Sequence, residues 1–179
     1  LDLQSWGLAY NGAEPVRHET LERFSAFFKP CGFRHKAFFP CYGLAEATLI
    51  VSSGPKVAPP FTLEVSKTDL EQNRVVVASQ GFGSASTLLS SGQIRTSQQV
   101  VIAHPSTLTH CLPNQIGEIW VAGPSVAQGY WHQPEVSART FHAFLKDTGE
   151  GPFLRTGDLG FIWAENLFIT SRLKDVIII

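Results

Sequence analysis

The chain has 179 residues, of which 44% are hydrophobic and 16% charged, and its formal net charge is −1. This apolar content suffices for a packed core, and the length suits one large domain or two small ones. Charges of both signs are mixed without a basic block, so neither nucleic acid nor an anionic membrane surface is an expected partner. No apolar run approaches the roughly 20 residues of a membrane-spanning helix.

The three cysteines, Cys31, Cys41 and Cys111, form no paired spacing. An odd number of thiols, behind an N-terminus unlike a secretory signal, indicates a reducing, cytoplasmic location. Cys31, His35 and Cys41 match none of the usual zinc-binding spacings, so we expect no metal there. The chain also lacks methionine and stops at the apolar run "DVIII", and we therefore expect it to be an internal piece of a longer protein.

Residues 1–53 alternate between patterns typical of strands and patterns typical of helices. The expected elements are a strand at 6–10, a turn at 11–12, a helix at 16–28 ended by Pro30 and Gly32, a strand at 34–43 and a second helix at 44–51. Strand, helix, strand and helix in this order predict an α/β layer with parallel strands.

The remaining sequence has a different character. Residues 54–80 open with prolines and continue as a polar stretch, which we interpret as a connector or an inserted element rather than core. From residue 81 onward, short β-type runs are separated by Gly, Pro and Asn turns. One helix is expected at 133–144, where Pro134 suits a first turn and Phe141 and Phe144 share a face.

The segment "PCYGLAEATLIVSSG" places Tyr42 and Glu46 four residues apart at the expected start of the second helix. Residues four apart share one helix face, and a helix N-terminus at a sheet edge favours phosphate. A ring there offers a stacking surface for a base, and a carboxylate offers a hard ligand for Mg²⁺. The alternative is that Tyr42 packs under the sheet and Glu46 is only solvated.

Three further segments carry candidate site residues. "NGAEP" is a strand-end turn in which Gly12 and Ala13 allow close approach of a flat ligand, although a plain turn before a helix explains it as well. "FLRTGDLGFI" puts Asp158 in a glycine-flanked turn, where its carboxylate accepts hydrogen bonds either from a sugar diol or within an Asx turn. "TSRLKD" places Arg172 and Lys174 at the end of a β segment, either in a site or as exposed edge charges.

Together, in this order, these segments resemble the adenylate-forming superfamily, which includes acyl- and aryl-CoA ligases, amino-acid adenylation domains and luciferases. "YGLAEAT" is similar to the superfamily's Tyr-Gly-x-(Thr/Ser/Ala)-Glu motif, "RTGDLG" to its Thr-Gly-Asp motif and "RLKD" to its hinge motif. The fatty acyl-AMP ligase branch is closer still, through "NGAEPVRHETLERF", "PCYGLAEATLIVSSGP", "GEIWVAGPSVAQGYW" and "GEGPFLRTGDLGFI". The resemblance extends over essentially the whole chain.

The resemblance implies a fold of class α/β plus β. Residues 1–53 would be the end of an α/β layered subdomain, and residues 81–170 a distorted β-barrel subdomain of a large adenylating domain. Residues 171–179 would approach the hinge to a C-terminal domain, with Lys174 as the hinge residue. Residues 54–80 become a candidate for the insertion that restricts domain rotation in acyl-AMP ligases and so disfavours CoA as the acceptor.

The implied reaction is attack of a fatty-acid carboxylate on the α-phosphate of ATP, which releases pyrophosphate and forms acyl-AMP. ATP and Mg²⁺ are the implied cofactors, and positioning and charge stabilisation dominate such catalysis. By the family pattern, Tyr42 lies against the adenine, and Glu46, as the catalytic residue, holds the Mg²⁺. Asp158 holds the ribose hydroxyls, with Arg172 on the far side. The other residues assigned to nucleotide binding are Gly12, Ala13, Glu14 and Gly43.

If the insertion interpretation holds, the acyl group passes to the phosphopantetheine arm of an acyl carrier protein. One alternative is an acyl-CoA ligase, with the same adenylation and CoA as acceptor. Another is a non-catalytic nucleotide-binding or interaction module, which is disfavoured because the motif side chains are all present. The superfamily's phosphate loop and catalytic lysine fall outside these residues, so we expect no adenylation by this chain alone.

Overall fold

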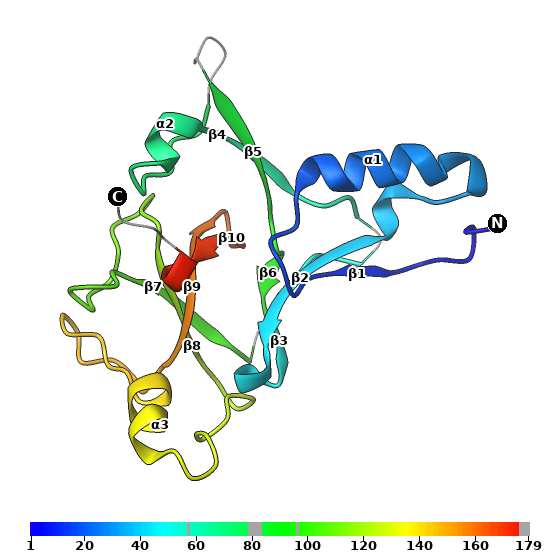
Figure 1. The fold of residues 1–179 in the computed structure, drawn as a ribbon. Coiled ribbons are helices and arrows are strands. Elements are labelled where there is room, and N and C mark those ends of the chain that lie inside the picture. The colour runs from blue at the N-terminus through cyan, green and yellow to red at the C-terminus, as the bar shows by residue number, and fades with distance from the viewer. Residues whose placement is uncertain (57, 79–83, 96, 176–179) are drawn as a thin grey trace.

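The computed structural model describes residues 1–56, 58–78, 84–95 and 97–175 (Figure 1). The larger of its sheets consists of β1 (Ala9–Asn11), β2 (Phe38–Leu44), β3 (Leu49–Ser53), β6 (Gln93–Ile94), β7 (Gln99–Ala103), β8 (Gly117–Ala122), β9 (Leu154–Trp163) and β10 (Asn166–Arg172). The smaller sheet pairs β4 (Thr62–Ser66) with β5 (Ala85–Leu89). The helices are α1 (His18–Phe28), α2 (Lys67–Leu70) and α3 (Pro134–Phe141), and single 3₁₀ turns are η1 (Lys29–Cys31), η2 (His35–Ala37), η3 (Ala45–Ala47) and η4 (Leu173–Asp175).

The larger sheet has the strand order β1-β2-β3-β6-β10-β9-β8-β7. β1 and β2 are parallel, and the other pairs within the described sheet are antiparallel. The chain therefore changes from an α/β unit to antiparallel β structure at β3, which confirms the predicted fold class. The described strands do not close into a barrel, because β1 and β7 remain the two edges of the sheet.

The α/β unit is built around α1, which lies beside β1 and β2 (Figure 1). Leu21 on its inner face packs with Ala9 of β1 and Phe38 of β2. The helix ends at Phe28, and after the 3₁₀ turn Gly32 takes φ 85°, a left-handed conformation that glycine adopts without strain. The expected helix and its stop are confirmed, whereas the first strand is shorter and later than the expected 6–10.

Residues 44–51 do not form the predicted helix. β2 stays extended to Leu44, Ala45–Ala47 make a single 3₁₀ turn, and Thr48 and the following leucine adopt positive φ of 51° and 75°. These two left-handed residues turn the chain back, so the apolar run that follows pairs with β2 as an antiparallel strand. A short apolar run is compatible with a helix and with a strand, and in this chain the left-handed turn selects the strand. Tyr42 and Glu46 therefore do not share a helix face.

The central strands are packed on both faces. Phe161 of β9 and Phe168 of β10 stack with ring centroids 4.9 Å apart and belong to a core cluster with Val65 of β4. Leu167, next to Phe168 in the chain, belongs to a second cluster with Phe141 of α3. Successive strand residues point to opposite faces, so this alternation holds β4–β5 on one side of β10 and α3 on the other.

The composition of residues 54–80 predicted a segment outside the core, and this prediction is wrong. Val65 and Val75 are fully buried and pack in the cluster that contains Phe161 and Phe168. The run "TLEVS" alternates apolar and polar residues, the pattern of a half-buried strand, behind a proline-rich start that concealed it. The role of this segment as an insertion, and the subdomain boundaries, stay predictions; residues 176–179 of the expected hinge region lie outside the described residues.

The helix expected at 133–144 is α3, and Pro134 occupies its first turn as predicted. It ends at Phe141, which is buried, whereas Phe144 lies beyond the helix and is 51% exposed, so the two rings do not share a face. No helix in the described part of the chain is long and apolar enough to cross a membrane.

Gly43 provides a test of the β2–β3 reversal. A Cβ at this position would lie 1.5 Å from the backbone oxygen of Leu49, so the strands would have to separate. We expect Gly43→Ala to lower the free energy of unfolding by about 1–3 kcal/mol or more. Gly7 has no atom within 4 Å of such a Cβ, and Gly7→Ala should change stability by less than about 0.5 kcal/mol. Urea denaturation of both variants measures the difference; equal stabilities would contradict the packing described.

Candidate functional site

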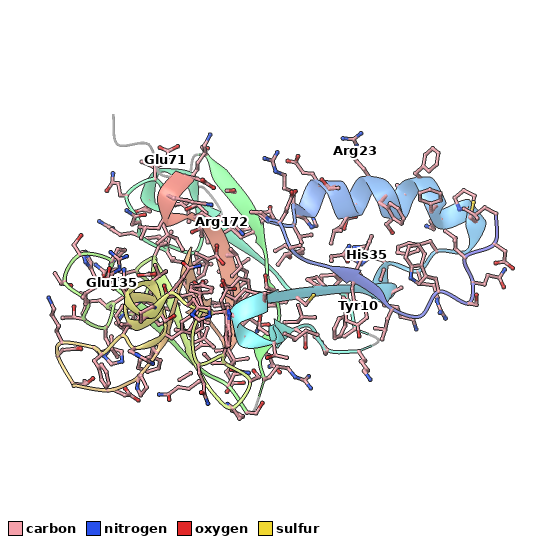
Figure 2. The ribbon with its side chains drawn as sticks, turned by 60° about the horizontal axis from the view of Figure 1, so that its bottom comes forward. Tyr10, Arg23, His35, Glu71, Glu135 and Arg172 are labelled. Atoms are coloured by element: carbon pink, nitrogen blue, oxygen red, sulfur yellow. The ribbon has the colours of Figure 1, made fainter. Side chains whose placement is uncertain are left out.

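A cavity of about 530 Å³ opens where the β1–α1 loop meets β2 and the end of β10. Arg172 lies at the end of β10, between the body of the sheet and the α1 region (Figure 2). The cavity is bordered by residues 13–16, 41–43, 89, 91, 158, 169–172 and 175. Six of the residues predicted to bind a nucleotide are therefore brought to one cavity: Ala13, Glu14, Tyr42, Gly43, Asp158 and Arg172.

The buried carboxylate of Asp158 is held from two sides. The hydroxyl of Tyr42 donates a hydrogen bond of 2.8 Å to Oδ2, and Nε of Arg172 donates one of 3.1 Å to Oδ1. A carboxylate can accept about four hydrogen bonds, so each oxygen keeps capacity for a further donor. Because Asp158 also borders the cavity, a ligand with two neighbouring hydroxyls can be bound here.

Tyr42 is buried, which agrees with the alternative that its ring packs under the sheet. It also borders the cavity, which agrees with the alternative that its ring faces a ligand. Burial raises the pKa of its hydroxyl, and the negative charge of Asp158 raises it further. The hydroxyl therefore remains a hydrogen-bond donor at neutral pH, and the ring is fixed at the cavity wall.

Asp158 is not in a turn, contrary to the prediction from its glycine neighbours. It lies within β9, directly opposite Arg172 of β10 in the antiparallel register. Gly157 does have a left-handed conformation, with φ 72°, but it acts as an irregularity inside a long strand. Opposite charges across a strand pair stabilise each other, and this register explains how residues 14 positions apart meet.

The β1–α1 loop contributes Ala13 and Glu14 to the cavity, and Ala13 adopts φ 69°. Gly12 does not border the cavity. A Cβ on Gly12 would lie 2.9 Å from the backbone oxygen of Cys41, so its small size serves the approach of the loop to β2. A role of Gly12 in binding a nucleotide stays a prediction.

Glu46 lies outside the cavity lining, on the η3 turn, and its Oε1 accepts a hydrogen bond of 2.7 Å from the hydroxyl of Tyr130. The backbone N–H of Ala127 donates to the backbone oxygen of Glu46, and Thr48 donates to the backbone oxygen of Ser125. The turn is thus fixed by the segment that follows β8, from about 80 residues away in the sequence.

The donor set at Glu46 is compatible with Mg²⁺ carried by a substrate. The described residues contain no group of three or more His, Cys, Asp or Glu that could hold an ion alone. Mg²⁺ usually keeps several waters and is bound by one or two carboxylates together with phosphate oxygens. Tyr130 occupies Oε1 of Glu46, and within the described residues Oε2 has no hydrogen-bond partner, which leaves it available as a ligand.

Lys174 is exposed in η4 and does not border the cavity, so its predicted role as a hinge stays a prediction. Cys31, Cys41 and Cys111 are free thiols. Cys41 borders the cavity, and burial raises the pKa of its thiol above the usual value.

Sequence reasoning missed three side chains that support the site: Glu118, Arg155 and Tyr130. Glu118 is a lone carboxylate in the apolar strand "GEIWVA", and such a carboxylate requires a buried partner, which is the signal that could have drawn attention to it. Its partner is Arg155, whose Nη2 lies 2.7 Å from Oε2. Tyr130 follows a loop without regular structure, and no local pattern links it to Glu46.

The chain matches the family model described as "AMP-binding enzyme" over residues 1–131. It is 51% identical over 181 residues to a medium-chain-fatty-acid–[acyl-carrier-protein] ligase, JamA, from Moorena producens. It is 36% identical over 189 residues to a long-chain-fatty-acid–AMP ligase, FadD32, from Mycolicibacterium smegmatis. These alignments cover 100% of this chain but 31% and 30% of the two relatives.

Among solved structures, the chain superposes on a fatty acyl-adenylate ligase from Legionella pneumophila in complex with acyl adenylate and pyrophosphate. The TM-score is 0.90 at 48% identity, over 98% of this chain and 30% of that one. The chain therefore spans less than a third of the length of the relatives it matches.

The bond between Tyr42 and Asp158 can be tested by removing one oxygen. Tyr42→Phe leaves one oxygen of the buried carboxylate, Oδ2, without its donor, and we expect the free energy of unfolding at neutral pH to fall by about 1–3 kcal/mol. Tyr10→Phe, at a ring that is 61% exposed, should change it by less than about 0.5 kcal/mol.

The same pair predicts a pH dependence. The pKa of Tyr42 is raised by folding, so its stabilising contribution is fully present below about pH 10, the usual pKa of tyrosine, and is lost as the pH rises through the higher folded value. The difference in stability between wild type and Tyr42→Phe should therefore be constant from neutral pH to about pH 10. A difference that disappears on acidification through neutral pH would contradict this assignment.

Proposed function

The chain belongs to the AMP-binding enzyme family, and we propose that the protein of which it forms part is a fatty acyl-AMP ligase. A carboxylate oxygen of the fatty acid bonds to the α-phosphorus of ATP, the bond from that phosphorus to the bridging oxygen breaks, and pyrophosphate leaves. The observation that carries the proposal is the carboxylate of Asp158, held between Tyr42 and Arg172 at the cavity.

Asp158 binds the ribose in this proposal. Its two oxygens are each engaged by one donor and can each accept another, which matches the paired hydroxyls of a ribose. The ring of Tyr42 lies against the adenine, and Ala13 and Glu14 line the opposite side. Support comes from the position of all these residues around one cavity. Arg172 orients the carboxylate through the hydrogen bond from its Nε.

Glu46 holds the Mg²⁺ through its open oxygen, with Tyr130 fixing the carboxylate by a hydrogen bond to the other. When bound, the ion supplies positive charge against the phosphate oxygens. In this proposal the described residues of the chain act without a covalent bond to the substrate. They hold the nucleotide in place so that the carboxylate can approach in line, and positioning of this kind lowers the barrier by removing the entropy cost of the encounter.

A fatty acid and an acyl carrier protein are the proposed substrate and partner. Support comes from two of the relatives, which are a medium-chain-fatty-acid–[acyl-carrier-protein] ligase and a long-chain-fatty-acid–AMP ligase. The acyl group would pass from AMP to the phosphopantetheine thiol. The role of residues 54–80 in the choice of acceptor cannot be tested by deleting them, because Val65 and Val75 within them are part of the core.

The products of the full-length protein test this function. We would incubate it with ATP, Mg²⁺, CoA and fatty acids of increasing length, and identify products by mass spectrometry. Acyl-AMP and pyrophosphate without acyl-CoA are expected. Acyl-CoA would move the protein to the acyl-CoA ligases and make residues 54–80 an ordinary part of the fold. Neither product, with any acid, would contradict the function and leave a nucleotide-binding module.

Asp158→Ala tests the ribose contact by itself. We expect calorimetry on the full-length protein to detect no AMP binding in this variant, because the carboxylate that accepts from the ribose is gone. Asp69→Ala is the matched control: Asp69 also forms an ion pair, with Arg74 at 3.0 Å, but does not border the cavity. Equal AMP affinity in the two variants would remove Asp158 from the site. Unfolding curves for both show whether each protein is still folded.

A further inference from the structure

We propose that Glu118 is a positioning residue that fixes Asp158 at the cavity and thereby determines the affinity for the nucleotide. The proposal rests on the proposed function only in that the ligand is taken to be an adenine nucleotide. Glu118 does not border the cavity, and its effect on a ligand is transmitted entirely through the backbone of β9.

Glu118 is 2% exposed. The hydrogen bonds that its carboxylate accepts within the described residues all come from one short segment of β9. Arg155 donates through Nε to both oxygens, at 3.3 and 3.1 Å, and through Nη2 to Oε2 at 2.7 Å. The backbone N–H of Gly157 donates to Oε1 at 3.2 Å. Glu118 thus binds the residue immediately before Asp158, and binds it through the backbone.

This contact falls where the regular sheet is interrupted. In the β8–β9 pairing, Glu118 lies opposite Leu159 and Trp120 lies opposite Arg155, with a register shift between them. Residues 156–158 of β9 therefore face the single residue Ile119, and they cannot all join the backbone ladder. Side chains replace it: Thr156 donates to the backbone oxygen of Ile119 at 2.7 Å and accepts from the N–H of Asp158 at 3.1 Å.

The bulge has consequences for the direction of the Asp158 side chain. Gly157 takes φ 72°, a conformation that rotates the following residue out of the regular alternation of the strand. Glu118 holds the N–H of this glycine, so it stabilises the bulged conformation directly. Without that acceptor, the segment is free to shift, and Asp158 moves relative to Tyr42 and Arg172.

Arg155 completes the arrangement by neutralising Glu118. A buried carboxylate without a cation is strongly unfavourable, and Arg155 satisfies both oxygens while its guanidinium lies over the ring of Trp120, 5.4 Å from the centroid. Its side chain is 30% exposed, on the solvent side of the pair. A buried ion pair is often no better for stability than an apolar pair of the same volume, so a positioning role explains its presence better than stability does.

The test is a double-mutant cycle in the full-length protein, with AMP binding measured by calorimetry. Glu118→Gln keeps the volume of the side chain but removes its charge and turns a donor group toward Arg155. We expect AMP to bind roughly tenfold more weakly. The KM for ATP should rise by a similar factor, and the KM for the fatty acid should be unchanged. Glu64→Gln, at an exposed carboxylate on β4 outside the cavity, is the matched control and should change neither value.

The second arm of the cycle is Asp158→Asn, alone and combined with Glu118→Gln. If Glu118 acts through Asp158, adding Glu118→Gln to Asp158→Asn has no further effect on AMP affinity. An equal tenfold loss in both backgrounds would overturn the proposal, because Glu118 would then act by loosening the fold in general. If Asp158→Asn alone leaves AMP binding intact, the ribose contact fails, and a role of Glu118 through Asp158 fails with it. If Asp158→Asn weakens AMP binding and Glu118→Gln does not, the Glu118 proposal alone fails and the ribose contact stands.

Discussion

The hydrogen bond between Tyr42 and Asp158 joins two strands that are not neighbours. In the strand order, β3, β6 and β10 lie between β2 and β9, yet the hydroxyl of Tyr42 is 2.8 Å from the carboxylate. The larger sheet must therefore curl until its concave face brings both residues together. A buried carboxylate is unfavourable without hydrogen-bond donors, and the curl of the sheet brings the Tyr42 donor to Asp158. Both residues border the cavity, so the cavity also depends on the curl.

β6, in the middle of this strand order, has only two residues and pairs with β10 at one position and with β3 at two. Gly92, just before it, takes φ 87°, and a Cβ there would lie 1.9 Å from the backbone carbon of Ser53. Around it, Ser52 donates to the backbone oxygen of Ser91, and Leu167 and the segment before β6 exchange backbone hydrogen bonds. Small residues here permit the close packing that turns one part of the sheet against the other.

Much of this architecture follows from local sequence pattern. α1 was predictable from helical spacing and its stop at Pro30 and Gly32. The candidate site residues were grouped by the family resemblance and not by a local pattern, and six of them border one cavity. The helix predicted at 44–51 was wrong because its backbone is set by Ser125 and Ala127, about 80 residues away, and not by its own side chains. The register that places Asp158 opposite Arg172 and the partner of Glu118 also depend on distant pairing, which no local pattern contains.

The separation along the chain between Tyr42 and Asp158, 116 residues, bears on when the cavity forms during folding. Closing a loop of that length has an entropy cost that must be met before the contact can stabilise anything, and contacts of high sequence separation slow folding. α1 and the hairpins can form early, because their partners are close in the chain. A chain with every local element in place but the sheet not yet curled would have no cavity, so the nucleotide of the proposed function would bind and stabilise only the fully folded form.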